Sequence, residues 1–503
     1  MSEIATYLGN KGYTIYKKNL EIEEQELIRK ELTVSPHVPK NSLQKPSPFP
    51  VYRESANKIY LPRYYGYNNY GEPDENRLNN YKTIDLKFKG DLRDKQKPVV
   101  EKYLNHVKNG GGGLLALHTG FGKTILALNI ISKLKVKTLI IVHKEFLLRQ
   151  WVERIEQFLP DAKVGRIQAK IIDVEDKDIV ICMLQSLSMK EYPAALFKEY
   201  GLTIVDECHH ISSEVFSRAL YKVVTKYMLG LSATVKRKDG LTFVIKMFLG
   251  ELVCKIERKG EDKVTVRGIE YKTHDEEFNQ VLLDYRGRVK YSSMIKKICE
   301  YNSRSEFILM VIGDIIKKDT KKKAQIMVLA HNKSILKYLH DAIKHRNIES
   351  VGYYVGGMKE KDLKISERKK IIIATYAMAE EGLDIKTLTT LVMATPKVDV
   401  TQAVGRILRM KHDNTEVYDI IDSHAMFQRH WGKRRAFYKK QKFKILISDN
   451  KRYQDDQWEC IYDVENNIRR RKKKKPGENN EVVIKVDTEP LDQLLSGKCM
   501  IDF

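Results

Sequence analysis

The chain has 503 residues, of which 42% are hydrophobic and 31% charged, so it is long enough for about three domains and apolar enough to exclude wholesale disorder. Its formal net charge of +24 favours a polyanionic partner, because basic side chains release counterions from phosphates; a basic membrane-surface protein would share this charge. The six cysteines show no Cys-x-x-Cys spacing, which argues against a disulfide framework or a zinc ribbon. No apolar run reaches the ~20 residues that span a bilayer, and the first residues lack signal-peptide character, so we expect a soluble intracellular protein.

Residues 1–85 are nearly neutral and hold ten of the 27 tyrosines. Several lie in the segment 59–70, IYLPRYYGYNNY, where Gly66 and the pair Asn68-Asn69 predict turns. We interpret this segment as a tyrosine-rich hairpin that packs on the rest of the chain; a surface that stacks bases is the alternative. The whole stretch is expected to form a small α+β or β-rich accessory module.

From residue 86, short apolar runs alternate with helical patterns, which is typical of parallel strands joined by crossover helices. A first α/β domain is predicted over 86–255. A second follows over 256–430 and begins with a charged linker around 257–277. The runs expected to be strands are 138–142, 178–183, 202–206 and 228–232 in the first domain, and 326–330, 371–375 and 391–395 in the second.

Residues 431–503 form a basic C-terminal extension that contains the unbroken run Arg469–Lys475. Such a run fits a tail that binds DNA, a nuclear localisation signal or a solvated loop. The predicted fold class is therefore α/β, with two tandem parallel-sheet domains between the accessory module and this extension.

The most specific motif is the segment 117–124, LHTGFGKT, which follows an apolar run and opens a helical pattern. Glycines let backbone N–H groups converge on phosphates at a helix N-terminus, so we expect ATP phosphates to lie here. Lys123 is predicted to reach the β- and γ-phosphates, and the Thr124 hydroxyl to ligate Mg²⁺. The strict pattern has Gly or Ala where this chain has Leu117. The predicted phosphate cradle consists of Thr119, Gly120, Phe121, Gly122, Lys123 and Thr124.

Two acids, Asp206 and Glu207, follow the apolar run LTIV at the expected carboxyl end of a strand. Asp206 is predicted to hold Mg²⁺, and Glu207 to orient and deprotonate the attacking water. The neighbouring residues 208–210, Cys-His-His, could be mistaken for a zinc site, but no second Cys/His pair stands at ligand spacing. Together, the loop and the acids predict an ATPase.

These motifs and others downstream resemble the superfamily 2 helicases over about 86–430. The resemblance implies two RecA-like domains that hydrolyse ATP in the cleft between them. It assigns adenine recognition to Gln96, ribose contact to Gly382 and Asp384, and contact with the γ-phosphate to Arg406 and Arg409. The segment expected to couple hydrolysis to domain movement is Ser232, Ala233 and Thr234.

Motors of this class hold mainly the sugar-phosphate backbone, so little sequence specificity is expected. By position in the resemblance, the candidates for this grip lie at or just after the carboxyl ends of predicted strands. They are His143, Lys144, Gln185, Ser186, His331, Asn332 and Thr375.

Within the superfamily, the chain has DECH at 206–209 rather than the DEAD-box sequence, and LGLSATVKRKDG around Asp239. Together with its length, the tyrosine-rich front and the phrase MATPKVDVTQAVGRILR, this resembles the poxvirus-type transcript-release helicases of large DNA viruses and the phage recombination helicases. The resemblance implies 3′-to-5′ movement on DNA with unwinding or displacement of RNA, transcription or recombination machinery as partners, and a virion, host-cytoplasmic or nuclear location. A monomer is expected, because both halves of the ATP site are in one chain.

Four other readings remain open, one of which is a restriction-type motor subunit, although the sequence shows no appended nuclease signature of paired acids followed by Glu-x-Lys. The motor could run on RNA, or on duplex DNA without unwinding it. A component of a different class would use ATP only as a structural switch in assembly. Lys123, Glu207 and Arg406 argue against that reading, since a scaffold needs no group that activates water.

Overall fold

The computed structural model describes residues 5–37, 47–78, 80–210, 214–234, 239–258, 262–320, 324–381, 385–410, 412, 414–466 and 468–469. The chain forms two compact units, Met1–Arg258 and Lys259–Phe503. We call them unit 1 and unit 2. None of the described helices is long and apolar enough to cross a membrane.

Unit 1 begins with a five-stranded sheet in the order β5-β6-β2-β1-β7. Helix α1 carries a capping box formed by Glu21 and Glu24, and a separate pair of short strands, β3 and β4, follows it. The elements are β1 Thr6–Gly9, β2 Gly12–Tyr16, α1 Ile22–Glu31, β3 Thr33–Val34, β4 Phe49–Pro50, β5 Arg53–Glu54, β6 Lys58–Leu61, α2 Arg63–Tyr70 and β7 Glu75–Asn76.

The tyrosine-rich segment ends strand β6 and then forms helix α2 over Arg63–Tyr70, so the predicted hairpin was wrong. A Cβ on Gly66 would lie 2.2 Å from the Tyr13 ring, which shows that this glycine allows the helix to approach the sheet rather than to turn the chain. The Tyr64 hydroxyl donates to the Gly110 carbonyl at 2.9 Å, and Arg63 donates to the Thr225 carbonyl at 3.0 Å. The segment therefore packs on the rest of unit 1, as the sequence analysis favoured.

The main sheet of unit 1 has the order β11-β10-β12-β9-β13-β14-β8-β15, and every neighbouring pair except β10–β11 is parallel. All four strands predicted for this part of the chain are confirmed. The strands are β8 Gly112–Leu117, β9 Thr138–Val142, β10 Val164–Gln168, β11 Ile171–Asp173, β12 Ile179–Met183, β13 Leu202–Asp206, β14 Tyr227–Ser232 and β15 Leu252–Ile256.

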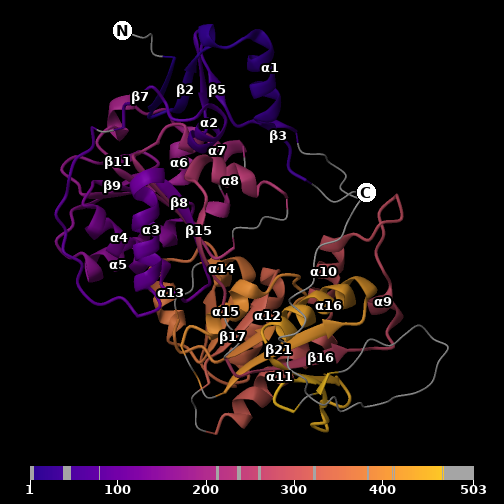
Figure 1. The fold of residues 1–503 in the computed structure, drawn as a ribbon. Coiled ribbons are helices and arrows are strands. Elements are labelled where there is room, and N and C mark those ends of the chain that lie inside the picture. The colour runs from indigo at the N-terminus through magenta and orange to yellow at the C-terminus, as the bar shows by residue number, and fades with distance from the viewer. Residues whose placement is uncertain are drawn as a thin grey trace. The chain divides into compact units, whose positions relative to one another are not determined.

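Helices cover both faces of this sheet (Figure 1). Because strand side chains alternate between faces, Ile140 and Val142 of β9 join the core on one side, whereas Leu139 and Ile141 join the core on the other. The first core is packed by α3 Lys97–Gly110, α4 Lys123–Leu134 and α5 Glu145–Phe158; the second by α6 Leu184–Met189, α7 Glu214–Leu220 and α8 Thr242–Leu249.

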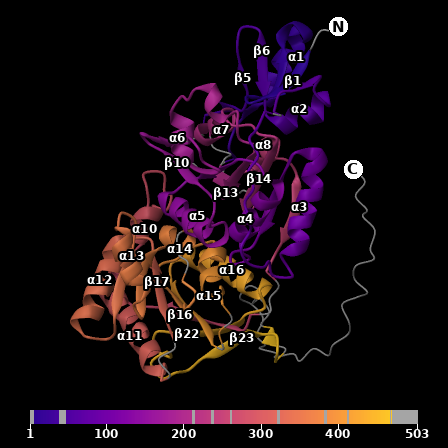
Figure 2. The same cartoon turned by 90° about the vertical axis from the view of Figure 1, so that its left-hand side faces the viewer.

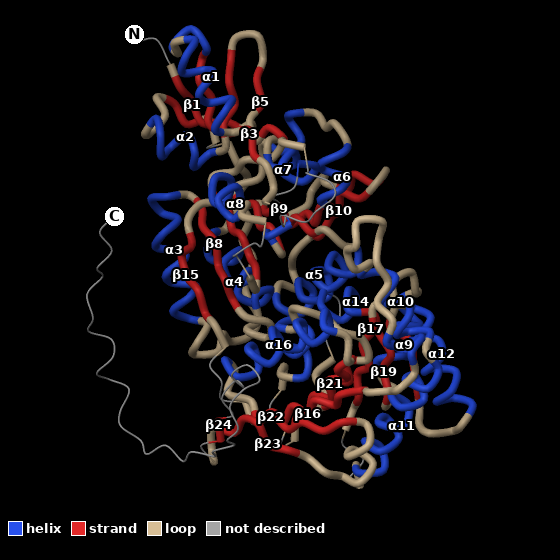
Figure 3. The backbone as a smooth tube through the Cα atoms, turned by 90° about the vertical axis from the view of Figure 1, so that its right-hand side faces the viewer, coloured by secondary structure: helices blue, strands red, loops and turns tan. Residues whose placement is uncertain are grey.

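Unit 2 is built on a nine-stranded sheet in the order β18-β19-β17-β20-β21-β16-β22-β23-β24, of which only the last two pairings are antiparallel (Figure 3). The strands predicted at 326–330, 371–375 and 391–395 are confirmed as β17, β19 and β20. The strands are β16 Val264–Tyr271, β17 Ile326–Ala330, β18 Val351–Tyr354, β19 Ile371–Thr375, β20 Thr390–Met393, β21 Thr415–Asp422, β22 Lys444–Asp449, β23 Glu459–Asp463 and β24 Ile468–Arg469.

Two segments that we expected outside the second sheet are part of it. The predicted charged linker contains β16, which pairs with β21 and β22. Helix α16 runs across residue 430, and β22, β23 and β24 then extend the sheet at its edge. Of the run that begins at Arg469, residues 470–475 lie outside the described residues.

The helices of unit 2 also lie on both sides of its sheet (Figure 2). One core is formed with α10, α11 and α12, and the other with α14, α15 and most of α16. The helices are α9 Glu276–Asn279, α10 Tyr291–Glu300, α11 Asn302–Lys318, α12 Lys333–His345, α13 Glu360–Glu367, α14 Tyr376–Glu381, α15 Thr401–Ile407 and α16 Ala425–Lys440.

Buried ion pairs tie these helices to β21. The Arg304 guanidinium of α11 donates to both carboxylate oxygens of Asp422, at 2.5 and 2.9 Å, and both side chains are fully buried. Arg434 of α16 donates in the same two-fold way to Asp419.

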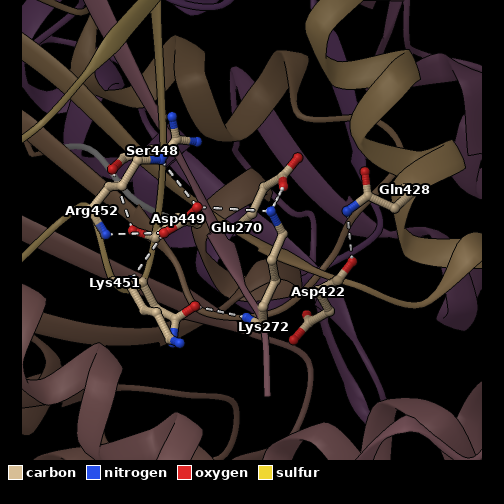
Figure 4. Close-up of polar contacts among 9 residues, drawn as sticks. Glu270, Lys272, Asp422, Gln428, Ser448, Asp449, Lys451 and Arg452 are labelled. Atoms are coloured by element: carbon tan, nitrogen blue, oxygen red, sulfur yellow. Dashed lines mark hydrogen bonds and ion pairs between the residues drawn. The ribbon is translucent and has the colours of Figure 1, made fainter. Parts of the chain in front are cut away.

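Figure 4 shows the polar network beside Asp422, in which Lys272 Nζ lies 2.8 Å from Glu270 Oε2.

Removing one partner of such a buried pair is expected to destabilise unit 2. Asp422→Ala leaves the Arg304 charge buried without its carboxylate, which should lower the free energy of unfolding by roughly 3–5 kcal/mol. Unfolding in urea, followed by tryptophan fluorescence in a Trp151→Phe background, reports unit 2 alone, because the chain's other two tryptophans, Trp431 and Trp458, lie there.

The matched control is the exposed pair Arg346–Glu306, which has the same two-fold geometry. Arg346→Ala should leave the midpoint of unfolding unchanged, because solvent screens this pair. An unchanged midpoint in Asp422→Ala would contradict the role given to the buried pair.

Candidate active site and nucleic-acid-binding residues

The predicted phosphate loop connects β8 to α4 and is shaped by two glycines with positive φ. Gly120 has φ 84° and Gly122 has φ 94°, a region that side chains other than glycine rarely enter. The Phe121 N–H donates to the His118 carbonyl at 3.1 Å, which closes the turn. Lys123 is the first residue of α4, so the loop ends at a helix N-terminus of the kind that binds phosphate groups. This geometry fits the phosphates of ATP.

Gln96 lies directly beneath this loop and is 2% exposed. Its side-chain N–H donates to the Phe121 carbonyl at 2.8 Å, and its side-chain oxygen accepts the Arg93 backbone N–H at 2.9 Å. A Cβ on Gly122 would lie 2.5 Å from the Gln96 amide nitrogen, so the glycine is needed for this close packing. The Arg93 guanidinium also contacts the Phe121 carbonyl. The contacts described for Gln96 position the loop, and its contact with adenine stays a prediction.

The two acids lie at the carboxyl end of β13, as expected. Lys123 Nζ lies 2.5 Å from Glu207 Oε1, so the loop and the acidic pair belong to one site. Asp206 accepts hydrogen bonds from the Trp151 indole N–H and from the Glu207 backbone N–H, each at 3.0 Å. Burial, and then the neighbouring charge of Glu207, raise the pKa of Asp206. Loss of a hydrogen-bond donor such as the Trp151 N–H, or of the nearby Lys123 charge, would therefore raise the pKa of Asp206 further.

Thr124 and Asp206 fit the way proteins hold Mg²⁺. This cation is usually bound by one or two carboxylates together with phosphate oxygens, rather than by a cage of protein ligands. The described residues contain no group of three or more His, Cys, Asp or Glu side chains that could hold a metal ion by themselves. Burial raises the pKa of the Cys208 thiol, which disfavours the thiolate that zinc requires.

Ser232, at the end of β14, is linked to the acidic pair through His209. His209 Nδ1 lies 3.1 Å from Ser232 Oγ and 3.4 Å from Glu207 Oε2. Ser232 Oγ in turn donates to the Thr234 carbonyl at 2.9 Å, and Ala233 lies between these two residues. A movement or change of charge of the Glu207 carboxylate can thus affect Ser232, the first residue of the predicted coupling segment, because the His209 ring contacts both side chains.

Three residues of this network were not singled out by the sequence analysis: Arg93, Trp151 and His209. Arg93 stands three residues before Gln96, and His209 is the last residue of DECH, so their position was the available signal. Trp151 has no motif signal, because its partner Asp206 is 55 residues away.

The predicted nucleic-acid contacts of unit 1 follow the adjacent parallel strands β9 and β12. Gln185 Nε2 donates to the His143 carbonyl at 2.7 Å, which brings the two strand ends together. Ser186 Oγ accepts the Ala169 backbone N–H at 2.9 Å. Lys144 precedes the first residue of α5. These four residues share one edge of the sheet, and their role in gripping a strand stays a prediction.

In unit 2, His331 and Asn332 follow β17, and Thr375 is the last residue of the neighbouring strand β19. His331 Nδ1 lies 2.9 Å from Thr395 Oγ1, and Thr375 Oγ1 accepts the Met378 N–H at 3.4 Å. Partial desolvation of the imidazole, followed by the charges of Lys397 and His430, lowers the pKa of His331 to about 4. Its ring is therefore neutral at physiological pH.

Arg406 lies on α15, and Arg409 follows this helix by two residues. Arg406 is 5% exposed. Burial raises the pKa of the Tyr354 hydroxyl, and the positive charges of Arg406 and Arg409 partly oppose this rise. Gly382 and Asp384 lie outside the described residues.

Comparisons with known proteins identify the family to which this chain is similar. A family profile described as "Type III restriction enzyme, res subunit" matches residues 89–237. A protein of Acanthamoeba polyphaga mimivirus, named "Putative ATP-dependent RNA helicase", is 34% identical over 91% of this chain and 90% of its own length. A "Putative helicase" of Invertebrate iridescent virus 6 is 28% identical over 72% of this chain and 84% of its own. The solved structure of T4 UvsW covers 89% of this chain and 100% of its own, with 18% identity and a TM-score of 0.33, so the family assignment rests on the sequence relatives.

Replacing Trp151 by Phe should shift the pH dependence of ATP hydrolysis. Phe keeps most of the packing but removes the N–H that stabilises the Asp206 carboxylate, so the pKa of Asp206 rises further. If hydrolysis needs the ionised Asp206 carboxylate, the ATPase rate of Trp151→Phe should fall on acidification at a higher pH than the rate of the wild type. The measurement is the steady-state ATPase rate between pH 5 and 9, with the buried Trp431→Phe of unit 2 as control; superimposable acid limbs would contradict the assignment.

Proposed function

We propose that this chain, which belongs to the superfamily 2 helicases of large DNA viruses, hydrolyses ATP at Lys123, Asp206 and Glu207 to move along DNA. Family membership makes it an ATP-dependent nucleic-acid helicase, and sets aside the reading in which ATP is only a structural switch. The observation that carries the proposal is the contact of Lys123 Nζ with Glu207 Oε1 at 2.5 Å, between the phosphate loop and the acidic pair.

The Lys123–Glu207 contact suggests how binding would prepare hydrolysis. A γ-phosphate in the loop would attract Lys123, because a phosphate carries more negative charge than one carboxylate. Glu207 would then lose its cation and be available to take a proton from the attacking water. Thr124 and Asp206 would hold Mg²⁺, whose charge would neutralise that of the phosphates.

We further propose that Arg406 and Arg409 stabilise the charge of the transition state at the γ-phosphate. A guanidinium in this role contributes about 10³–10⁵ in rate. Gln96 and the segment around Asp384 would contact the adenosine. Ser232, Ala233 and Thr234 would pass the state of Glu207 to the rest of the enzyme through His209, which contacts both.

The proposed track is the sugar-phosphate backbone of DNA, read with little sequence specificity. Support comes from the net charge of +24 and from the polar residues at the carboxyl edges of both sheets, at His143 and Gln185 in unit 1 and at His331 and Thr375 in unit 2. We also propose that the protein moves in the 3′-to-5′ direction and displaces nascent RNA. Its partners would be the transcription or recombination machinery. RNA as the track is the second candidate, since the mimivirus relative is named as an RNA helicase.

Two substitutions should separate nucleotide binding from hydrolysis. Lys123→Ala should abolish ATP hydrolysis, whereas Glu207→Gln should still bind ATP but turn over about 10²–10⁴-fold more slowly, the usual contribution of a general base. The measurements are steady-state ATPase and equilibrium binding of a fluorescent ATP analogue. Lys133→Ala, an exposed lysine on the same helix α4, is the matched control; normal turnover in both site variants would refute the assignment.

The choice of nucleic acid should decide how strongly ATP hydrolysis is stimulated. We expect stimulation by single-stranded and forked DNA in the wild type and none in Lys123→Ala. Strand displacement should be faster on a fork with a 3′ tail than on one with a 5′ tail. Stimulation by single-stranded RNA alone would transfer the proposal to the RNA track, and stimulation by no polymer would contradict both.

A further inference from the structure

A hairpin between α9 and α10 exposes an unusual number of apolar side chains. Four of the fifteen large hydrophobic side chains that are exposed among the described residues lie between 281 and 289, and a fifth, Tyr291, is the first residue of α10. Tyr285, at the tip, is 83% exposed. Exposed apolar side chains that gather in one place usually mark a binding surface. We call residues 280–290 the tip hairpin; in Figure 1 it extends beyond the ends of α9 and α10.

The tip hairpin is held in a defined shape. Its two arms pair at Leu283 and Val289, and the Asp284 N–H donates to the Arg288 carbonyl at 2.7 Å. Asp284 Oδ1 accepts the backbone N–H groups of Arg286 and Arg288, at 2.8 and 2.9 Å. These bonds, the one from Arg288 foremost, lower the pKa of the Asp284 carboxyl group. The exposed ring therefore stands on an ordered turn.

The base of the hairpin is anchored to α10. The Leu282 N–H contacts the sulfur of Met294 at 3.3 Å, and Lys297 Nζ donates to the Gln280 carbonyl at 2.7 Å. Leu282 packs against the hydrophobic core of unit 2, whereas Leu283 and Tyr285 point to solvent. The core thus positions the hairpin without using the ring at its tip.

The charges of the tip fit a polyanion. Arg286, Arg288 and Lys290 outnumber the single acid Asp284, whose carboxylate is already bonded to the turn. The Arg286 guanidinium lies 4.9 Å from the centre of the Tyr285 ring. An exposed aromatic ring beside cations is the combination by which proteins stack nucleic-acid bases and hold their phosphates without reading sequence.

The position of the hairpin agrees with this chemistry. It follows β16, which runs parallel to β21, so the chain reaches it from the carboxyl edge of the sheet, where His331 and Thr375 also lie. The Tyr291 ring, where α10 begins, is 5.7 Å from the His430 ring. The base of the hairpin therefore lies beside α16, which carries His430.

We propose that the tip hairpin is a further nucleic-acid contact, in which Tyr285 stacks on an unpaired base and Arg286 binds a neighbouring phosphate. This inference rests on the proposed function and adds a contact to it that lies outside the helicase motifs. The contact would take either DNA or RNA, because every base offers a face for stacking.

The test measures equilibrium binding of the full-length protein to fluorescent single-stranded DNA and RNA oligonucleotides. Tyr285→Ala should weaken binding about 5- to 150-fold, the loss that corresponds to one stacked base, and Tyr285→Phe should bind within about twofold of the wild type. Arg286→Ala should lower the slope of log Kd against log salt by about 0.7, and Tyr285→Ala should leave this slope unchanged. Met189→Ala, which removes a similarly exposed apolar side chain from unit 1, is the control and should bind normally.

The outcomes separate this inference from the proposed function. Oligonucleotide binding by the wild type with equal affinity in Tyr285→Ala would overturn the tip contact and leave the proposed motor intact. Equal losses in Tyr285→Phe and Tyr285→Ala would exclude stacking. Tyr285-dependent binding in a protein whose ATPase no polymer stimulates would support the tip contact and contradict the proposed motor.

Discussion

Parallel strand pairing is the constraint on which the rest of this molecule depends. Parallel neighbours cannot be joined by a tight turn, so the strands that pair in parallel are joined by crossovers, and their carboxyl ends meet at one edge of each sheet. In unit 1 this edge collects the phosphate loop after β8, the acids at the end of β13 and Ser232 at the end of β14. Residues more than a hundred positions apart thereby enter one site, and their chemistry follows from strand order.

At that edge of the sheet in unit 1, the charge balance of the site depends on which group the Lys123 ammonium contacts. Its ammonium group neutralises Glu207 in the structure, while Asp206 is held by Trp151 and has a raised pKa because of burial and the charge of Glu207. A site with one cation and two adjacent acids is poised to respond to any group that attracts the cation. Nucleotide binding would redistribute these charges, and His209 gives the change a route to Ser232.

Much of this arrangement could be predicted from the sequence, because it depends on local patterns. Apolar runs marked the buried parallel strands, glycines marked the phosphate loop, and the position of Asp206 and Glu207 after a strand placed them at the binding edge. Side-chain contacts between distant segments could not be predicted in the same way. The pairing of Trp151 with Asp206 is one example, and the buried pair of Arg304 with Asp422 is another.

The errors have the same origin. Strand β16 was hidden in a charged stretch, since Arg267 finds its partner Glu416 only across the sheet, at 2.9 Å and 149 residues away. Gly66 suggested a turn, whereas the structure uses its missing side chain to bring α2 against Tyr13. Charge and glycine have several structural uses, and only the tertiary neighbours decide between them.

The central claim is that ATP binding moves Lys123 from Glu207 to the γ-phosphate. A crystal structure of the full chain with Mg²⁺ and a non-hydrolysable ATP analogue measures this directly, as the distance between Lys123 Nζ and Glu207 Oε1. We predict that the contact, 2.5 Å long in the present structure, is broken and that Nζ lies within hydrogen-bond distance of a γ-phosphate oxygen. A bound analogue with the Lys123–Glu207 contact still in place would contradict the account.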